Sequence, residues 1–241
     1  MTRLPKIIPF GLSVSILLIC ISAIVLPFQQ AHAGAGQDCT SEIPARIISG
    51  CTELIKAGRI TGVGLPAVFF NRGRGHLRAG NYDLAIEDFG VQLHLGGPDI
   101  DAYLLRGSTF YKLGRFDRAI RDYNLGLKLN SRHPVLYAQR GDANVAKHDQ
   151  DRAMADYSRA LELAPTRADI WTRRGDLLRK TGAFNRAVSD YEKAIALAGG
   201  DLVRNWQKRL KVKGHYTGAI DGSYGKNTRA ALRACIVKPG C

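Results

Sequence analysis

The sequence predicts an all-α fold in which helical hairpins stack into a right-handed superhelix and a small helical module follows them. Three observations predict this architecture. An Arg-Gly pair recurs every 34 residues, an alanine followed four residues later by an aromatic residue recurs with the same period, and each repeat separates into two amphipathic stretches. Because one hairpin cannot bury its apolar face alone, neighbouring hairpins must stack, which places their first helices on a concave surface.

Length and composition are those of an ordinary globular protein, since 45% of the 241 residues are hydrophobic and 23% are charged. A chain of this length buries a sizeable core without covalent staples. The formal net charge is +14. In an exported chain this excess points to anionic polymers or lipid head groups, or only to solubility, and nucleic acid is not an expected partner.

The amino-terminal segment has the pattern of a targeting sequence. Arg3 and Lys6 precede an apolar run from Ile7 to Leu26, and small residues follow at Ala31 and Ala33. This predicts a secretory signal peptide over residues 1–33, and no membrane span after its cleavage. The run is also long enough to cross a membrane, so an uncleaved anchor is the alternative.

Four cysteines remain beyond the signal, as one pair near the start and one at the end of the chain. An even number of closely spaced cysteines in an oxidising compartment predicts two local disulfides, Cys39 with Cys51 and Cys235 with Cys241. The two pairs lie at opposite ends and no histidine stands at ligand spacing, so neither a metal site nor another cofactor is expected.

The repeats occupy residues 66–99, 100–133, 134–167 and 168–201. In the second of them, helices are predicted over 101–113 and 117–129 with a turn at 114–115. A central glycine in the first helix and an alanine in the second allow two backbones to approach, while the aromatic residue fills the space between hairpins. Gly73, Gly80, Tyr82, Ala85 and Phe89, with their counterparts, resemble the tetratricopeptide repeat, which implies a groove for a protein or peptide.

One residue of each repeat departs from that family, because an arginine precedes the central glycine where the family usually has leucine. An aspartate follows 16 residues later in every repeat: Arg72 with Asp88, Arg106 with Asp122, Arg140 with Asp156, and Arg174 with Asp190. We predict a bidentate ion pair across each hairpin. The alternative is two solvated charges that never meet. The third repeat departs most, with His148 and Gln150 where glycine and an aromatic residue stand elsewhere.

Residues 34–65 are predicted to form lead-in helices, because Ile47, Ile48 and Cys51 resemble the second helix of an incomplete preceding repeat. The first helices of the full repeats would line the groove. Its candidate binding residues are Phe70, Arg74, Arg78, Ser108, Tyr111, Lys112, Asp142, Asp176, Arg179 and Lys180. Arg74, Arg78 and Lys112, with Tyr111 among them, form a predicted basic patch for a carboxylate or phosphate. The alternative is an ordinary solvated surface.

The period ends at Gly199 and Gly200, and a different module is predicted over residues 202–241. It begins with a helix that ends near Gly214, passes through glycine-rich turns, and closes with a helix from Thr228, capped by Asn227 or Thr228. The residues Gln207, Leu210, Gly214, Tyr216, Gly218, Asp221, Gly222, Tyr224, Gly225, Thr228, Ala231 and Leu232 resemble the small peptidoglycan-binding domain of bacterial wall enzymes.

That resemblance covers about residues 201–236 and implies binding to wall glycan. Asp221 and Gly222 are predicted to form a turn, and Tyr216, Tyr224 and Leu232 a small core. The candidate glycan-binding residues are Lys211, Lys213, Tyr216, Tyr224 and Lys226. The alternative is a polar cap that closes the stacked repeats.

Catalytic residues are not expected. His76, His94, His133, His148 and His215 are scattered, and the sequence contains no paired metal-ligating histidines on a helix, no nucleophile elbow and no phosphate-binding loop. The sequence therefore predicts a non-enzymatic exported adaptor of the periplasm or cell envelope, which binds a protein or peptide through its groove and peptidoglycan through its last module. A secreted scaffold with a terminal cap is the alternative, followed by an accessory subunit of a wall-remodelling enzyme.

Overall fold

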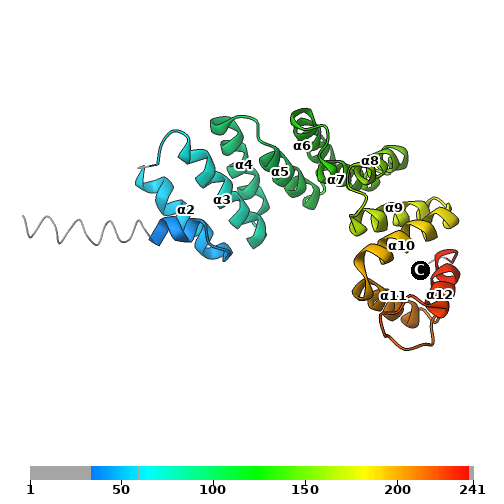
Figure 1. Cartoon of the computed structure of the whole chain (residues 1–241). Helices are drawn as coiled ribbons and strands as arrows, with labels where there is room; N and C mark the ends of the chain where they lie inside the picture. The colour runs from blue at the N-terminus through cyan, green and yellow to red at the C-terminus, as the bar shows by residue number, and fades with distance from the viewer. Residues whose placement is uncertain (1–33, 59, 239–241) are drawn as a thin grey trace, which may run out of the picture. The chain divides into compact units, whose positions relative to one another are not determined.

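The structure, a computed structural model, describes residues 34–58 and 60–238, which are helical with intervening turns and contain no strand in these ranges (Figure 1). The chain divides into an amino-terminal part up to Gly97 and a carboxy-terminal part from Pro98. The predicted signal peptide and Cys241, and with it the predicted Cys235–Cys241 bond, lie outside the described residues. None of the described helices is long and apolar enough to cross a membrane.

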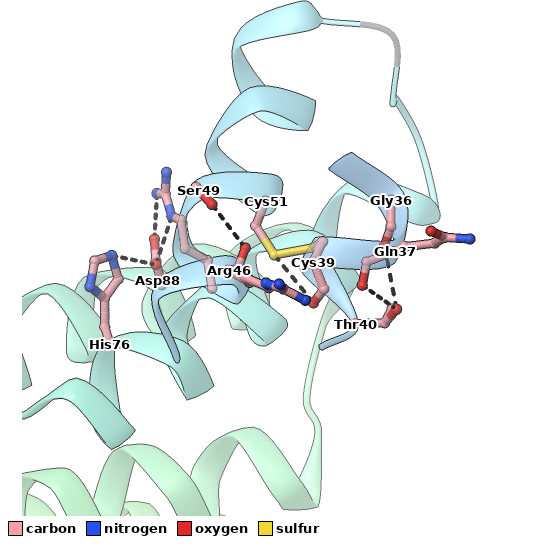
Figure 2. The surroundings of a disulfide bond; sticks show 10 residues. Gly36, Gln37, Cys39, Thr40, Arg46, Ser49, Cys51, His76 and Asp88 are labelled. Atoms are coloured by element: carbon pink, nitrogen blue, oxygen red, sulfur yellow. Dashed lines mark hydrogen bonds and ion pairs between the residues drawn. A yellow bond between two sulfur atoms is a disulfide. The ribbon is translucent and has the colours of Figure 1, made fainter. Parts of the chain in front are cut away.

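The amino-terminal part consists of a short helical stretch over residues 34–39, followed by α2 (Pro44–Ala57), α3 (Gly64–Ala79) and α4 (Tyr82–Gly96). Helices α3 and α4 form a hairpin, and α2 packs on α3 as the second helix of a preceding repeat would. Cys39 and Cys51 are buried, and their sulfur atoms lie 2.03 Å apart, at disulfide bonding distance (Figure 2).

The carboxy-terminal part contains three hairpins and the module. The hairpins are α5 (Ile100–Lys112) with α6 (Phe116–Leu129), α7 (Pro134–Ala146) with α8 (Gln150–Leu163), and α9 (Ala168–Lys180) with α10 (Phe184–Ala198). Helices α11 (Gly200–Val212) and α12 (Lys226–Ile236) follow. The predicted all-α fold of stacked hairpins is confirmed.

The packing of an aromatic ring directly against the first helix explains the recurring glycine. A β-carbon at Gly107 or Gly141 would lie 2.7 Å from the ring of Tyr123 or Tyr157, closer than atoms can pack. Ala119 and Ala153 of the second helices are fully buried. Each aromatic ring therefore occupies space that only a glycine on the facing helix leaves open.

The module shares its hydrophobic core with the last hairpin. The rings of Tyr191 on α10 and Trp206 on α11 meet edge to face with centroids 4.9 Å apart. Tyr216, Leu232 and Ile195 belong to the same buried cluster, and Tyr224 packs against its edge. The small core predicted from Tyr216, Tyr224 and Leu232 is part of this larger cluster, because the apolar face of α10 forms one wall of it.

Gln207, rather than a helix cap, organises the loop before α12. Its side chain is fully buried; Nε2 donates to Asp221 Oδ1 at 2.7 Å, and Oε1 accepts the Gly222 N–H at 2.9 Å. Gly222 has φ +76°, which explains the glycine in the predicted turn. The predicted cap is wrong: α12 starts at Lys226 without a side-chain cap, and the Thr228 hydroxyl donates to the Ser223 carbonyl.

Candidate binding sites on the repeats and the module

The predicted arginine–aspartate pairs are present in all four hairpins. In the second repeat, Arg106 Nε and Nη2 donate to the two carboxylate oxygens of Asp122 at 2.8 and 2.7 Å. The equivalent bonds span 2.6 to 3.2 Å in the other repeats. The aspartate side chains are only 5 to 6% exposed. These charges therefore serve the scaffold and are not available to a ligand.

Each of these arginines makes further contacts that sequence reasoning missed. Its guanidinium lies over an aromatic ring three residues earlier, as Arg174 lies 4.9 Å from the centroid of Trp171. Arg140 and Arg174 also donate to the preceding repeat, to Asn124 Oδ1 at 2.5 Å and Ser158 Oγ at 3.3 Å. The arginine thus joins the two helices of its own hairpin and, in these two repeats, the second helix of the hairpin before.

The first-helix face contains a row of hydroxyl hydrogen bonds. Tyr157 donates to Asp142 at 2.7 Å, and Tyr191 donates to Asp176 at 2.6 Å. Burial raises the pKa of both tyrosine hydroxyls, and the nearby carboxylates raise it further. The two predicted groove carboxylates are therefore held in fixed positions by the second helix of their own hairpin.

A cavity of about 180 Å³ opens on this face between α7 and α9. It is lined by Asp142, Val145, Tyr157, Arg173, Asp176, Leu177 and Lys180. Arg173 forms an ion pair with Asp142 across the two helices. Burial raises the pKa of Asp142 above its ordinary value, although the Arg173 charge and the Tyr157 hydroxyl act in the opposite direction. The cavity combines fixed charges of both signs with apolar walls, which suits a peptide segment.

Three of the predicted groove residues, Asp142, Asp176 and Lys180, meet in this cavity. Arg173 was missed, although its position three residues before Asp176 places it on the same helical face. Arg179 lies near the Tyr191 hydroxyl and lowers its pKa. Four of the predicted groove residues, Asp142, Asp176, Arg179 and Lys180, therefore lie on α7 and α9.

On α5, the predicted groove residues Ser108 and Tyr111 contact side chains of α6. Tyr123 donates to Ser108 Oγ at 3.4 Å, and the ring of Tyr111 contacts Phe116 with centroids 5.5 Å apart. Burial raises the pKa of Tyr111. Lys112 is exposed.

The remaining groove candidates, Phe70, Arg74 and Arg78, lie in the amino-terminal part of the chain. Phe70 packs on Phe89 with centroids 5.8 Å apart, and is therefore part of the hairpin interior as well as its surface. Arg78 donates to Glu42 Oε2 at 2.9 Å and to the Glu42 carbonyl. Arg74 is half-buried. The predicted basic patch thus draws on an arginine that already has a carboxylate partner.

The predicted glycan-binding residues of the module differ in their exposure to solvent. Lys211, Lys213 and Lys226 are exposed. Tyr216 is only 8% exposed, and its hydroxyl donates to the Ala219 carbonyl at 2.8 Å, so the prediction of a surface role for this ring is wrong. Tyr224 is half-buried against α10. In the part of the chain that the structure describes, no three His, Cys, Asp or Glu residues group as metal ligands do.

The described residues thus form helical hairpins of 34-residue period, followed by a small helical module. Two tetratricopeptide repeat models match residues 70–134 and residues 135–167 and 168–201, together more than half of the chain. The chain belongs to the tetratricopeptide repeat family. A third model, described as a putative peptidoglycan binding domain, matches residues 199–235.

Solved structures share the fold. MamA from Desulfovibrio magneticus RS-1 is 15% identical with a TM-score of 0.62, over 70% of this chain and 93% of that one. A thermophilic TPR protein of Thermus thermophilus is 19% identical with a TM-score of 0.54, over 64% and 83%. YrrB, a TPR protein with an unusual peptide-binding site, is 17% identical with a TM-score of 0.53, over 64% and 78%. No curated protein sequence matches the chain significantly.

Proposed function

We propose that the protein is an exported, non-enzymatic adaptor that binds a protein or peptide on its first-helix face and peptidoglycan through its carboxy-terminal module. The observation that carries this proposal is the core shared by α10, α11 and α12. Because this core joins the module rigidly to the last repeat, a partner held by the repeats is held at a fixed distance from the wall.

Protein or peptide binding is supported by the family and by the cavity between α7 and α9. The family match covers both hairpins that line the cavity. Its charged residues Arg173, Lys180 and Asp176 suit a segment that carries both charges, and Val145 and Leu177 suit an apolar side chain. YrrB, which has the same repeat fold, is a TPR protein with an unusual peptide-binding site.

Association with peptidoglycan is supported by the matched domain and by charge. Lys211, Lys213 and Lys226 are exposed on the module, and peptidoglycan carries carboxylates on its peptide stems. Attraction between exposed charges weakens with added salt. Export is supported by the signal-like pattern over residues 1–33 and by the Cys39–Cys51 pair, which suits an oxidising compartment such as the periplasm.

Cosedimentation of the full-length protein with purified insoluble peptidoglycan tests the proposal. We expect binding at low salt that weakens at moderate salt, and a marked loss of binding when Lys211, Lys213 and Lys226 are all changed to Gln. The matched control changes three exposed lysines outside the module, Lys56, Lys128 and Lys193, to Gln. An equal loss in the control would mean unspecific charge attraction.

Absence of binding would favour the second candidate function, a protein–protein scaffold whose module is a cap. That candidate has its own support, because the module covers the apolar residues Val188, Tyr191 and Ile195 of α10. Removal of the module is not a suitable test, since it would uncover this apolar face and change the last repeat as well.

A further inference from the structure

A second cavity, of about 340 Å³, lies where the last repeat meets the module. It is lined by Glu192, Ile195, Ala196, Gly199, Gly200, Val203, Gly222, Tyr224 and Arg229. Three of these residues come from α10, which precedes the residues matched by the peptidoglycan-binding model. The cavity is therefore composite, because neither the repeat nor the module forms it alone.

The walls of this cavity are apolar and sterically open. Ile195, Ala196 and Val203 supply aliphatic surface, and Gly199 has no side chain to occupy the space. A β-carbon built on Gly199 would meet no atom within 4 Å. A ligand with small side chains can therefore approach the backbone closely.

The charges at its edge leave a positive excess. Glu192 Oε1 lies 3.6 Å from Arg229 Nε and 3.4 Å from Arg233 Nη2, so one carboxylate serves two guanidinium groups. Both arginine side chains are more than half exposed, at 54 and 60%. A ligand carboxylate would complete this cluster, and arginine binds carboxylates with two parallel hydrogen bonds.

Tyr224 disfavours a sugar ring as the ligand. The Arg229 guanidinium lies over one face of its ring, 5.4 Å from the centroid, and the hydroxyl donates to Glu192 Oε1 at 3.3 Å. Burial and the Glu192 charge raise the pKa of Tyr224 to about 12, so the hydroxyl stays a donor. The ring thus holds the charged cluster in place instead of offering an open face for stacking.

We propose that this composite cavity binds the peptide stem of peptidoglycan, with the terminal carboxylate on Arg229 and the small alanine side chain against Ile195, Ala196 and Val203. The inference rests on the proposed function and deepens it, since it names the part of the wall polymer that is recognised. It also assigns a role in wall binding to α10, a helix of the repeats.

Calorimetric titration of the full-length protein with a synthetic stem peptide ending in a free D-alanine carboxylate tests this site. We expect binding to weaken about tenfold in Arg229→Gln, because a charge-assisted hydrogen bond is lost. Ala196→Phe, which fills the cavity and leaves every charge in place, should weaken it similarly. Arg186→Gln, the matched change at an exposed arginine of α10 outside the cavity, should have no effect.

Further probes identify the source of the ligand. A C-terminally amidated stem peptide should bind more weakly, and a wall glycan free of peptide should not compete. Equal binding of an all-L peptide ending in alanine would overturn the proposal in favour of a protein carboxy terminus. Stem binding that is unchanged by both cavity variants would also overturn it.

The two proposals fail differently. Cosedimentation with whole peptidoglycan without any stem binding would overturn only the composite cavity. Loss of both would overturn the adaptor function itself. A circular dichroism spectrum of each variant verifies that its helices remain folded.

Discussion

Tyr157 and its acceptor Asp142 illustrate a pairing between the two helices of a hairpin that recurs along the chain. Where the first helix offers an acceptor, at Ser108, Asp142 or Asp176, the facing aromatic residue is a tyrosine whose hydroxyl donates to it. In the first repeat the corresponding position is Arg74, which cannot accept, and the aromatic residue is Phe89. The donor is thus present only where its bond can be made, since an unpaired buried hydroxyl is costly.

His76 gives the amino-terminal part a pH dependence. Its Nε2 lies 3.9 Å from Asp88 Oδ2, and Arg72 and Asn81 are its other polar neighbours (Figure 2 shows the contact with Asp88). Burial lowers the pKa of His76 below 6.5; the Asp88 charge opposes this and the Arg72 charge adds to it. In the folded protein the imidazole is therefore neutral at pH values where the unfolded chain already binds a proton.

The free energy of unfolding should consequently fall as the pH is lowered from about 6.5 toward the folded pKa. We expect His76→Gln to reduce this dependence, measured as the difference in urea midpoint between pH 7.5 and pH 5. His94→Gln, at an exposed histidine of α4, is the control and should behave as the unchanged protein. Equal pH dependence in all three proteins would contradict the assignment to His76.

At the scale of the helix, the turn inside each hairpin requires a left-handed residue. Gly80, Gly114 and Gly182 have φ between +70° and +81° at this turn. In the third repeat the equivalent residue is His148, with φ +62°. A side chain in this region is strained, because the β-carbon crowds the backbone carbonyl.

We expect His148→Gly to stabilise the protein, by at most about 1 kcal/mol, because the relief of strain is partly offset by the greater freedom of glycine in the unfolded chain. The reciprocal change Gly114→His, at the same turn of the second repeat, should destabilise it. Thermal unfolding of both variants measures this. Destabilisation by His148→Gly would show that the imidazole makes a favourable contact that exceeds the strain.

The elements could be predicted from the sequence because their signals are local and repeated four times. The period located each hairpin, and the spacing of 16 residues located each arginine–aspartate pair. The contacts from Arg140 to Asn124 and from Arg173 to Asp142 could not be predicted in this way. They join different repeats, and their partners depend on how two hairpins rotate against each other.

At the scale of the whole molecule, the module depends on the repeats for its core. The sequence places the start of the module at Gly199 and Gly200, where the 34-residue period ends. The alternative prediction, a cap that closes the stacked repeats, implies that the module covers the last hairpin. The sequence does not show which residues of α10 the module contacts. Gln207, to which the sequence motif assigns no separate role, is buried beside the loop before α12 and donates to Asp221.

We expect Trp206→Ala to destabilise α10 together with the module. The ring is 6% exposed and contacts Tyr191, and removing such a buried indole costs roughly 3 to 5 kcal/mol. Hydrogen exchange should accelerate in α10, α11 and α12 together, while α5 and α6 keep their protection. Faster exchange in α11 and α12 alone would contradict the shared core.

The same core also determines when the composite cavity can form during synthesis of the chain. A chain made from its amino terminus completes each hairpin from nearby residues, but the cavity beside Arg229 exists only after α12 has reached α10. A chain interrupted before residue 226 would have its repeats and α11, but it would lack the apolar residues of α12, such as Leu232 and Ile236, that complete the shared core. The composite cavity can therefore form only after α12 has been synthesised, and a copy that lacks α12 exposes hydrophobic surface of the kind that chaperones and proteases act on.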